Sequence, residues 1–197
     1  ILVLIILFDN YYLSSFATLF LASWIAVGTL QVSRKRNVGY WSFLRRRLSV
    51  TFAHLGMAIL VLGVGVVSSY SLEKEVILAP GNSLDFGDQT VSFQSVEDSL
   101  GPNYISKSAE IYFDDGETLS QLVTEKRTYS PSGQLTTEAG IKSDLFKDLY
   151  ISMGDNLDTN IWSFKIQIKP FIRWIWLGAL MIAIGSFLAG SKQIRRI

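Results

Sequence analysis

The chain has 197 residues, of which 49% are hydrophobic, and its 18 Lys and Arg nearly balance its 17 Asp and Glu. It has no cysteine, which excludes disulfides, thiolate metal sites and cysteine nucleophiles. The net charge is close to zero because basic and acidic stretches cancel, so by itself it says little about partners.

The chain starts in the middle of an apolar run. Residue 1 is Ile, and residues 1–8 are all apolar, without the basic start or the small-residue cleavage site of a signal peptide. We therefore expect 1–8 to be a membrane helix truncated at its N-terminus, and the chain to be the C-terminal part of a longer protein.

Three longer apolar segments have the length of membrane-crossing helices. They cover residues 11–32, 48–70 and 170–191, each close to the twenty residues that a helix needs to cross the hydrocarbon core. A buried helix of a soluble protein would explain one such segment, but three with strongly biased flanks favour a membrane protein. The sequence therefore predicts three complete transmembrane helices besides the truncated one.

The distribution of charge predicts how these helices are oriented. Segment 33–47 and the tail 192–197 carry basic residues and no acidic ones, namely Arg34, Lys35, Arg36, Arg45, Arg46, Arg47, Lys192, Arg195 and Arg196. Cytoplasmic loops are enriched in Lys and Arg, so both segments are predicted to be cytoplasmic. Residues 71–169, which hold nearly all of the acidic residues, are then predicted to lie on the opposite side of the membrane.

Residues 71–169 have the pattern of an antiparallel β domain inserted between two transmembrane helices. Apolar and polar residues alternate along two segments, with Ala109, Ile111 and Phe113 in one and Trp162, Phe164, Ile166 and Ile168 in the other. Asp115–Gly116 predicts a hairpin turn between strands. We expect an α+β membrane protein with a small sandwich or barrel, whose only helical piece covers 137–149, where Ala139, Ile141, Leu145 and Leu149 have helical spacing.

His54 is the only histidine, and it falls inside the predicted helix 48–70. Ionisable groups within a membrane are costly and usually functional, and a neutral imidazole is a common axial ligand of haem iron. Ala58, Val61 and Gly65 follow on the same helix face and leave space for another helix or a flat ligand. A histidine that bonds a neighbouring helix or reaches toward the headgroups remains the alternative.

Other candidate residues have simpler explanations, and no catalytic residue can be identified. Trp174 and Trp176 beside Arg173 are typical of an interfacial aromatic belt. One group of charged residues suggests an ion-pair network or a docking surface, namely Glu125, Lys126, Arg127 and Glu138. A second group is explained by a hairpin turn without a metal, namely Asp114, Asp115 and Glu117.

Five strings in a fixed order resemble one known family. They cover residues 53–56, 122–129, 137–141, 148–150 and 169–178, around the same succession of span, domain and span. Together they resemble the C-terminal region of the CcmF family, the cytochrome c haem lyases of bacterial-type cytochrome c maturation. The resemblance runs from about Phe43 to Arg196.

The resemblance implies a protein of the bacterial inner membrane, with 71–169 as a periplasmic domain. It implies that the whole protein attaches haem to apocytochrome c. The expected partners are a haem chaperone and other membrane proteins of the pathway, and nucleic acid is not expected among them. His54 matches an axial ligand of a haem b in the membrane, whose second ligand lies outside this chain. The chain alone is not expected to catalyse haem attachment. The alternatives are a membrane-anchored scaffold without haem and a transporter fragment with His54 on a proton path.

Overall fold

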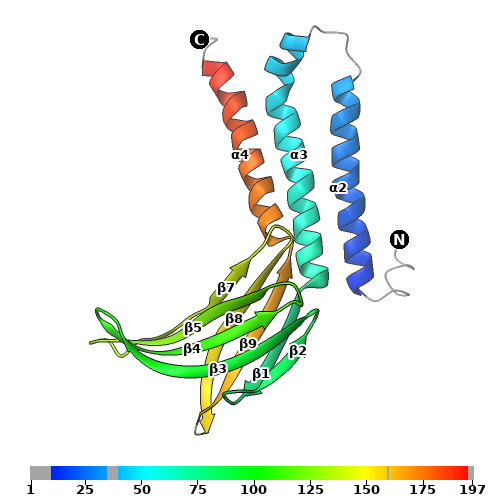
Figure 1. The fold of residues 1–197 in the computed structure, drawn as a ribbon. Helices are drawn as coiled ribbons and strands as arrows, with labels where there is room; N and C mark the ends of the chain where they lie inside the picture. The colour runs from blue at the N-terminus through cyan, green and yellow to red at the C-terminus, as the bar shows by residue number, and fades with distance from the viewer. Residues whose placement is uncertain (1–9, 35–39, 159, 195–197) are drawn as a thin grey trace. The chain divides into compact units, whose positions relative to one another are not determined.

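A computed structural model of the protein describes residues 10–34, 40–158 and 160–194, so the predicted partial helix 1–8 lies outside the described residues. The chain divides into two compact units (Figure 1). A helical unit is formed by residues 1–70 and 170–197, and a β unit is formed by Ser71–Lys169. Since one unit is inserted into the other, the chain passes between them twice.

The helical unit contains α2 (Asn10–Arg34), α3 (Tyr40–Tyr70) and α4 (Ile172–Ile194). Among the described residues, Leu13–Gln31, Leu48–Tyr70 and Ile172–Ser191 are long and apolar enough to cross a membrane. The three predicted complete spans are therefore present as helices. Helix α3 begins at Tyr40, inside the predicted basic loop, because the Leu and Arg residues before Leu48 favour helix and no Pro or Gly interrupts them.

Helices α3 and α4 make backbone contact through glycines. A Cβ atom at Gly178 would lie 2.6 Å from the carbonyl oxygen of Gly56, and one at Gly185 would lie 2.6 Å from that of Ser49. A Cβ atom at Gly63 would meet Ile175 Cγ1 at 2.9 Å. Small residues at such positions let membrane helices approach closely, so these glycines set the distance between α3 and α4.

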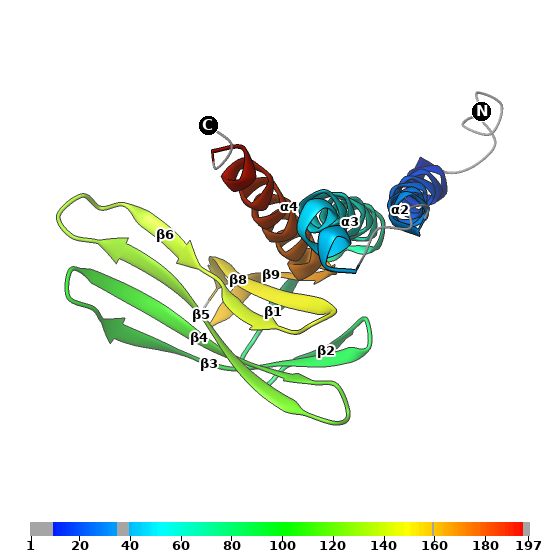
Figure 2. The same cartoon turned by 90° about the horizontal axis from the view of Figure 1, so that it is seen from above.

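The β unit is a sandwich of two antiparallel sheets, seen as two layers in Figures 1 and 2. The smaller sheet has the strand order β1-β9-β8-β7, and the larger sheet has the order β2-β3-β4-β5-β6. The strands are β1 (Leu72–Leu78), β2 (Ser83–Phe86), β3 (Gln89–Leu100), β4 (Tyr104–Asp114), β5 (Leu119–Tyr129), β6 (Leu135–Glu138), β7 (Gly140–Ser143), β8 (Lys147–Asp158) and β9 (Ile161–Pro170). The predicted antiparallel β domain is thereby confirmed, and of the two predicted architectures it is the sandwich.

The core of the sandwich includes the alternating apolar residues that the sequence indicated. Phe164 on β9 is only 1% exposed, and its ring packs edge-on against that of Phe93 on β3, with the ring centroids 4.9 Å apart. The two rings come from opposite sheets and hold them together. The other predicted core residues are also buried, namely Ala109, Ile111, Phe113, Trp162, Ile166 and Ile168.

The predicted helix over 137–149 is wrong, because this segment forms β6, β7 and the start of β8. Asp148 organises the hairpin between β7 and β8 by accepting hydrogen bonds from Ser143 Oγ at 3.1 Å and from the Asp144 amide at 3.2 Å. Gly140, a poor helix former, begins β7 with no space for a side chain, because a Cβ atom there would lie 2.8 Å from the Val123 carbonyl oxygen. The helical spacing was a coincidence between residues of different strands.

Candidate functional site

The ring of His54 is exposed on α3 and is oriented by a backbone hydrogen bond. Its Nδ1 lies 2.8 Å from the carbonyl oxygen of Val50, one turn earlier in the helix. A carbonyl oxygen only accepts, so Nδ1 must carry the hydrogen in this contact. In the neutral imidazole the lone pair therefore resides on Nε2, which is the nitrogen free to bind a metal.

His54 lies beside the stripe of α3 that packs on α4. Its neighbour Ala53 belongs to that stripe, because a Cβ atom at Gly185 of α4 would lie 2.7 Å from the Ala53 amide nitrogen. On the face of His54 itself, Ala58 is buried and Gly65 is filled by α2, where Thr18 Oγ1 occupies the space of a Cβ atom. The small residues predicted to admit a helix or a flat ligand thus admit a helix at Gly65.

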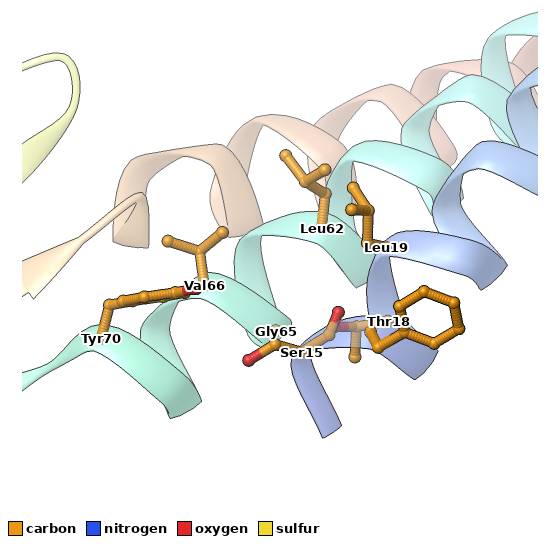
Figure 3. Close-up of a pocket in the computed structure, with 8 residues that line it drawn as sticks. Ser15, Thr18, Leu19, Leu62, Gly65, Val66 and Tyr70 are labelled. Carbon is orange, nitrogen blue, oxygen red and sulfur yellow. The ribbon is translucent and has the colours of Figure 1, made fainter. Parts of the chain in front are cut away.

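A pocket lies where α2 meets the end of α3 (Figure 3). It is lined by Ser15, Phe16, Thr18, Leu19, Leu62, Gly65, Val66 and Tyr70. A hydrogen bond of 2.6 Å from Ser15 Oγ to Ser69 Oγ ties the two helices at this level. Gly65 is about 16 Å along the helix from His54 at 1.5 Å per residue, so the pocket and the histidine are separate sites.

Within the described part of the chain, no group of three or more His, Asp or Glu residues could hold a metal ion. The acidic residues at the β4–β5 turn are explained by the hairpin, as predicted. Asp115 accepts hydrogen bonds from the amides of Thr118 at 2.7 Å and Glu117 at 3.1 Å, which lower the pKa of its carboxyl to about 2. The carboxylate therefore stabilises the turn.

The charged residues around Arg127 form a half-buried network on the larger sheet. Arg127 Nε donates to Glu125 at 2.8 Å, and its Nη1 lies 3.3 Å from Glu138. Its guanidinium also lies over the Tyr104 ring, 4.7 Å from the centroid, and the bond to Glu125 raises the Arg127 pKa further above its usual range. Lys126 projects from the other face of the strand and pairs with Asp155 at 2.5 Å. Both sets of contacts are internal to the β unit, which favours the structural role.

The tryptophans at the start of α4 differ in their surroundings. Trp174 is half-buried and stacks on Phe171 with centroids 5.5 Å apart, whereas Trp176 is exposed. An exposed indole near the end of an apolar helix is consistent with the predicted aromatic belt, which remains a prediction.

Comparison with known proteins places the chain in a family. A family model described as "CcmF C-terminal beta-sandwich" matches residues 69–170, which cover the whole β unit and more than half of the chain. The chain belongs to the CcmF family. The resemblance seen in the sequence is thereby confirmed, and the β sandwich described above is the domain that defines the match.

Individual relatives extend the match beyond the sandwich. The chain is 30% identical to "Cytochrome c-type biogenesis protein CcmF" of Pseudomonas aeruginosa, over 96% of this chain and 30% of that protein. It is 39% identical to the protein of the same name from Haemophilus influenzae, over 77% of this chain and 24% of that protein. The chain thus spans less than a third of the length of these CcmF relatives.

A solved structure shares the fold. The structure titled "Cytochrome c Heme Lyase CcmF" superposes with a TM-score of 0.72 over 85% of this chain and 29% of that chain, at 22% sequence identity. The matched 85% of this chain is longer than its β unit, so the match also includes part of its helical unit.

The sequence located His54 but missed two features that the structure adds. The glycines at the α3–α4 contact were not singled out, although the spacing of seven residues between Gly56 and Gly63, and between Gly178 and Gly185, was a usable signal. The hydrogen bond from His54 to Val50 gave no signal beyond the spacing of four residues, which is common to every helix.

Proposed function

We propose that this chain is the C-terminal part of a membrane protein of cytochrome c maturation, and that His54 Nε2 is an axial ligand of a haem b held between its membrane helices. The observation that carries the proposal is the 2.8 Å contact between His54 Nδ1 and the Val50 carbonyl. Metal-bound histidines usually donate their second ring nitrogen to a carbonyl or carboxylate, which fixes the tautomer and makes the ligating nitrogen more basic.

The residues present fit such a group. His54 is exposed from the described helices, so its Nε2 is accessible from outside α3, and the helix keeps the ring in one orientation. Val50, one turn before His54, is apolar and exposed, and would lie beside a flat macrocycle. A haem b bound there supplies a one-electron couple, and the role of His54 is to hold the iron in position and to tune its potential.

The activity proposed for the whole protein is the attachment of haem to apocytochrome c. Since the chain spans less than a third of its relatives, the second iron ligand and the catalytic residues are proposed to lie in the rest of the protein. The thiols that form the thioether bonds would belong to the apocytochrome, which fits a chain without cysteine. A haem chaperone and other membrane proteins of maturation would be partners.

The proposed location is the bacterial inner membrane, with the β unit in the periplasm and the basic segments in the cytoplasm. Single cysteines replacing Ser83 in β2 and Gln193 near the end of α4 should react with a membrane-impermeant maleimide from opposite sides of sealed vesicles. The chain has no cysteine of its own, so each variant reports one site once any cysteine in the rest of the full-length protein is replaced by serine. Labelling of both from the same side would overturn the orientation.

The haem proposal is tested by replacing His54 with alanine in the full-length protein. The purified variant should lose most of its haem or change from a bis-histidine to a five-coordinate spectrum, because one axial nitrogen is removed. Free imidazole should partly restore the original spectrum by filling the cavity left by the ring. Haem content and the optical spectrum of both redox states are the measurements.

Met57→Ala is the matched control, because Met57 is another exposed residue of the same span. It should leave haem content and spectrum unchanged. If the His54→Ala protein keeps its haem and an unaltered spectrum, His54 is not a ligand. If the full-length wild type holds no haem, the scaffold alternative replaces the proposal.

A further inference from the structure

The hairpin between β7 and β8 has an apolar loop. The Asp144 amide donates a hydrogen bond of 3.0 Å to the Lys147 carbonyl oxygen, which leaves Leu145 and Phe146 as the two residues of the loop, 61% and 55% exposed. Hairpin loops are normally built from Gly, Asn, Asp, Ser and Pro, and the loops that follow β2, β3, β4 and β5 contain only polar residues, Gly and Pro. The formation of a turn therefore does not explain a leucine and a phenylalanine here.

This β7–β8 loop projects past the end of β9, the strand that leads into α4. The Lys169 ammonium lies 5.0 Å from the centroid of the Tyr150 ring, and the Asp155 amide donates to Ser163 Oγ at 2.8 Å, so β8 runs antiparallel to β9. Residues before Tyr150 consequently extend in the direction in which β9 leaves the sandwich, by about 3.3 Å per residue while they remain in a strand. Since Lys169 is the last residue but one of β9, the loop lies beyond the end of that strand.

The start of β1 lies at the same end of the sandwich. Lys147, which follows the loop, bonds Asp88 of the β2–β3 turn at 2.8 Å. A Cβ atom at Gly87 in that turn would lie 3.4 Å from Ile168 Cδ1 and 3.6 Å from Leu72 Cδ1. The loop, the beginning of β1 and the end of β9 therefore share one end of the sandwich, which we name the anchored end.

The covalent chain keeps the anchored end close to the two spans that flank the β unit. α3 ends at Tyr70 and β1 begins at Leu72, while β9 ends at Pro170 and α4 begins at Ile172. Two peptide steps cover at most about 7 Å. If these helices cross a membrane, as proposed above, a loop that projects from the anchored end reaches the headgroup region.

The surroundings of the loop suit a zwitterionic lipid surface. Lys147 is paired with Asp88, and Lys142 on the other side of the loop lies 3.8 Å from Asp115, so neither lysine depends on an anionic lipid for a partner. Lysine can keep its ammonium in water while its stem lies along apolar material, and aromatic side chains such as Phe146 are typical near the membrane surface.

We propose that the β7–β8 loop inserts Leu145 and Phe146 into the headgroup region of the bilayer. The two apolar side chains leave water, and the lysines on either side of the loop remain at the surface. Interfacial insertion of apolar side chains reaches about 5–10 Å into the boundary between headgroups and acyl chains, a depth that suits a loop of two residues. The insertion gives the β unit a third attachment to the membrane besides its two covalent connections.

The test is an environment-sensitive nitrobenzoxadiazole label on Leu145→Cys in the full-length protein, with any other cysteine replaced by serine, in phosphatidylcholine nanodiscs. Its emission should shift to the blue, and it should lose most of its intensity when the lipid carries a doxyl quencher near the headgroup. The same label on Leu100→Cys is the control, because Leu100 is 83% exposed at the end of β3 far from the β2–β3 turn. It should keep its intensity.

Two results at Leu145 would overturn the proposal. A label that emits as in water would show that the loop stays outside the bilayer, and a blue-shifted label that doxyl lipid does not quench would show that the rest of the protein covers it. The labelling of Ser83 and Gln193 decides the membrane location separately. Their labelling from opposite sides, together with an unquenched Leu145 label, would overturn the insertion alone.

An aspartate at the second residue of the loop tests whether the loop itself causes the quenching. Phe146→Asp in the protein labelled at Leu145 should abolish most of the quenching, since a carboxylate is excluded from the apolar layer. Ile77→Asp is the matched control, because Ile77 is 62% exposed near the end of β1 that is far from Leu72, and it should leave the quenching unchanged. Unchanged quenching in Phe146→Asp, or an equal loss in both variants, would contradict the insertion of this loop.

Discussion

Truncation of Phe164 to alanine is expected to lower the free energy of unfolding of the β unit by about 3–5 kcal/mol. The ring is fully buried and contacts Phe93 of the opposite sheet, so its removal leaves a cavity between two sheets that cannot close without bending a strand. Chemical unfolding of the full chain, followed by near-ultraviolet circular dichroism, measures the change.

Leu119→Ala is the control for Phe164→Ala, because Leu119 is an exposed apolar residue of the same unit. It should change the unfolding free energy by no more than about 0.5 kcal/mol. A Phe164→Ala protein that unfolds at the same denaturant concentration as the wild type would show that the two sheets are not held together by this residue.

Replacement of Gly178 by leucine is expected to separate α3 from α4. A Cβ atom at this position would lie 2.6 Å from the Gly56 carbonyl oxygen and 2.7 Å from the Leu60 amide nitrogen, and backbone atoms of a helix cannot move aside. Overpacking of this kind costs about 1–3 kcal/mol. The melting temperature of the full-length protein in detergent should fall accordingly.

Gly190→Leu is the matched control on the same helix, because a Cβ atom at Gly190 would meet nothing within 4 Å. It should leave the melting temperature unchanged. Equal melting temperatures for Gly178→Leu and the wild type would mean that the two helices are not in backbone contact in the folded protein.

The strands of the sandwich were predictable where a strand has one buried and one polar face. Ile111 and Phe164 belong to such alternating runs, and burial of every second residue leaves a period that only a strand produces. Segment 137–149 has no such run, because β6 and β7 each pair over only four residues. Its conformation depends on which strands it meets, and pairing partners are not encoded in local spacing.

The state of two side chains could likewise not be predicted from the sequence. His54 stands out as the single histidine in an apolar helix, but which ring nitrogen is free follows only from the contact to Val50. Trp162 was correctly predicted as a core residue, whereas the missing partner of its indole N–H is a property of the assembled sandwich. Periodicity reports which side of an element is buried and does not report which polar atoms remain unpaired there.

The two strands that join the β unit to the helices are neighbours in one sheet, with Leu72 opposite Ile168. The sandwich therefore brings the end of β9, which leads into α4, within one strand spacing, about 5 Å, of the start of β1, which follows α3. An unstructured connector of the same length would cost about 3 kcal/mol more in loop-closure entropy than a short turn. Folding of the sandwich removes this penalty, so a variant that unfolds it weakens the pairing of α3 with α4 without touching either helix.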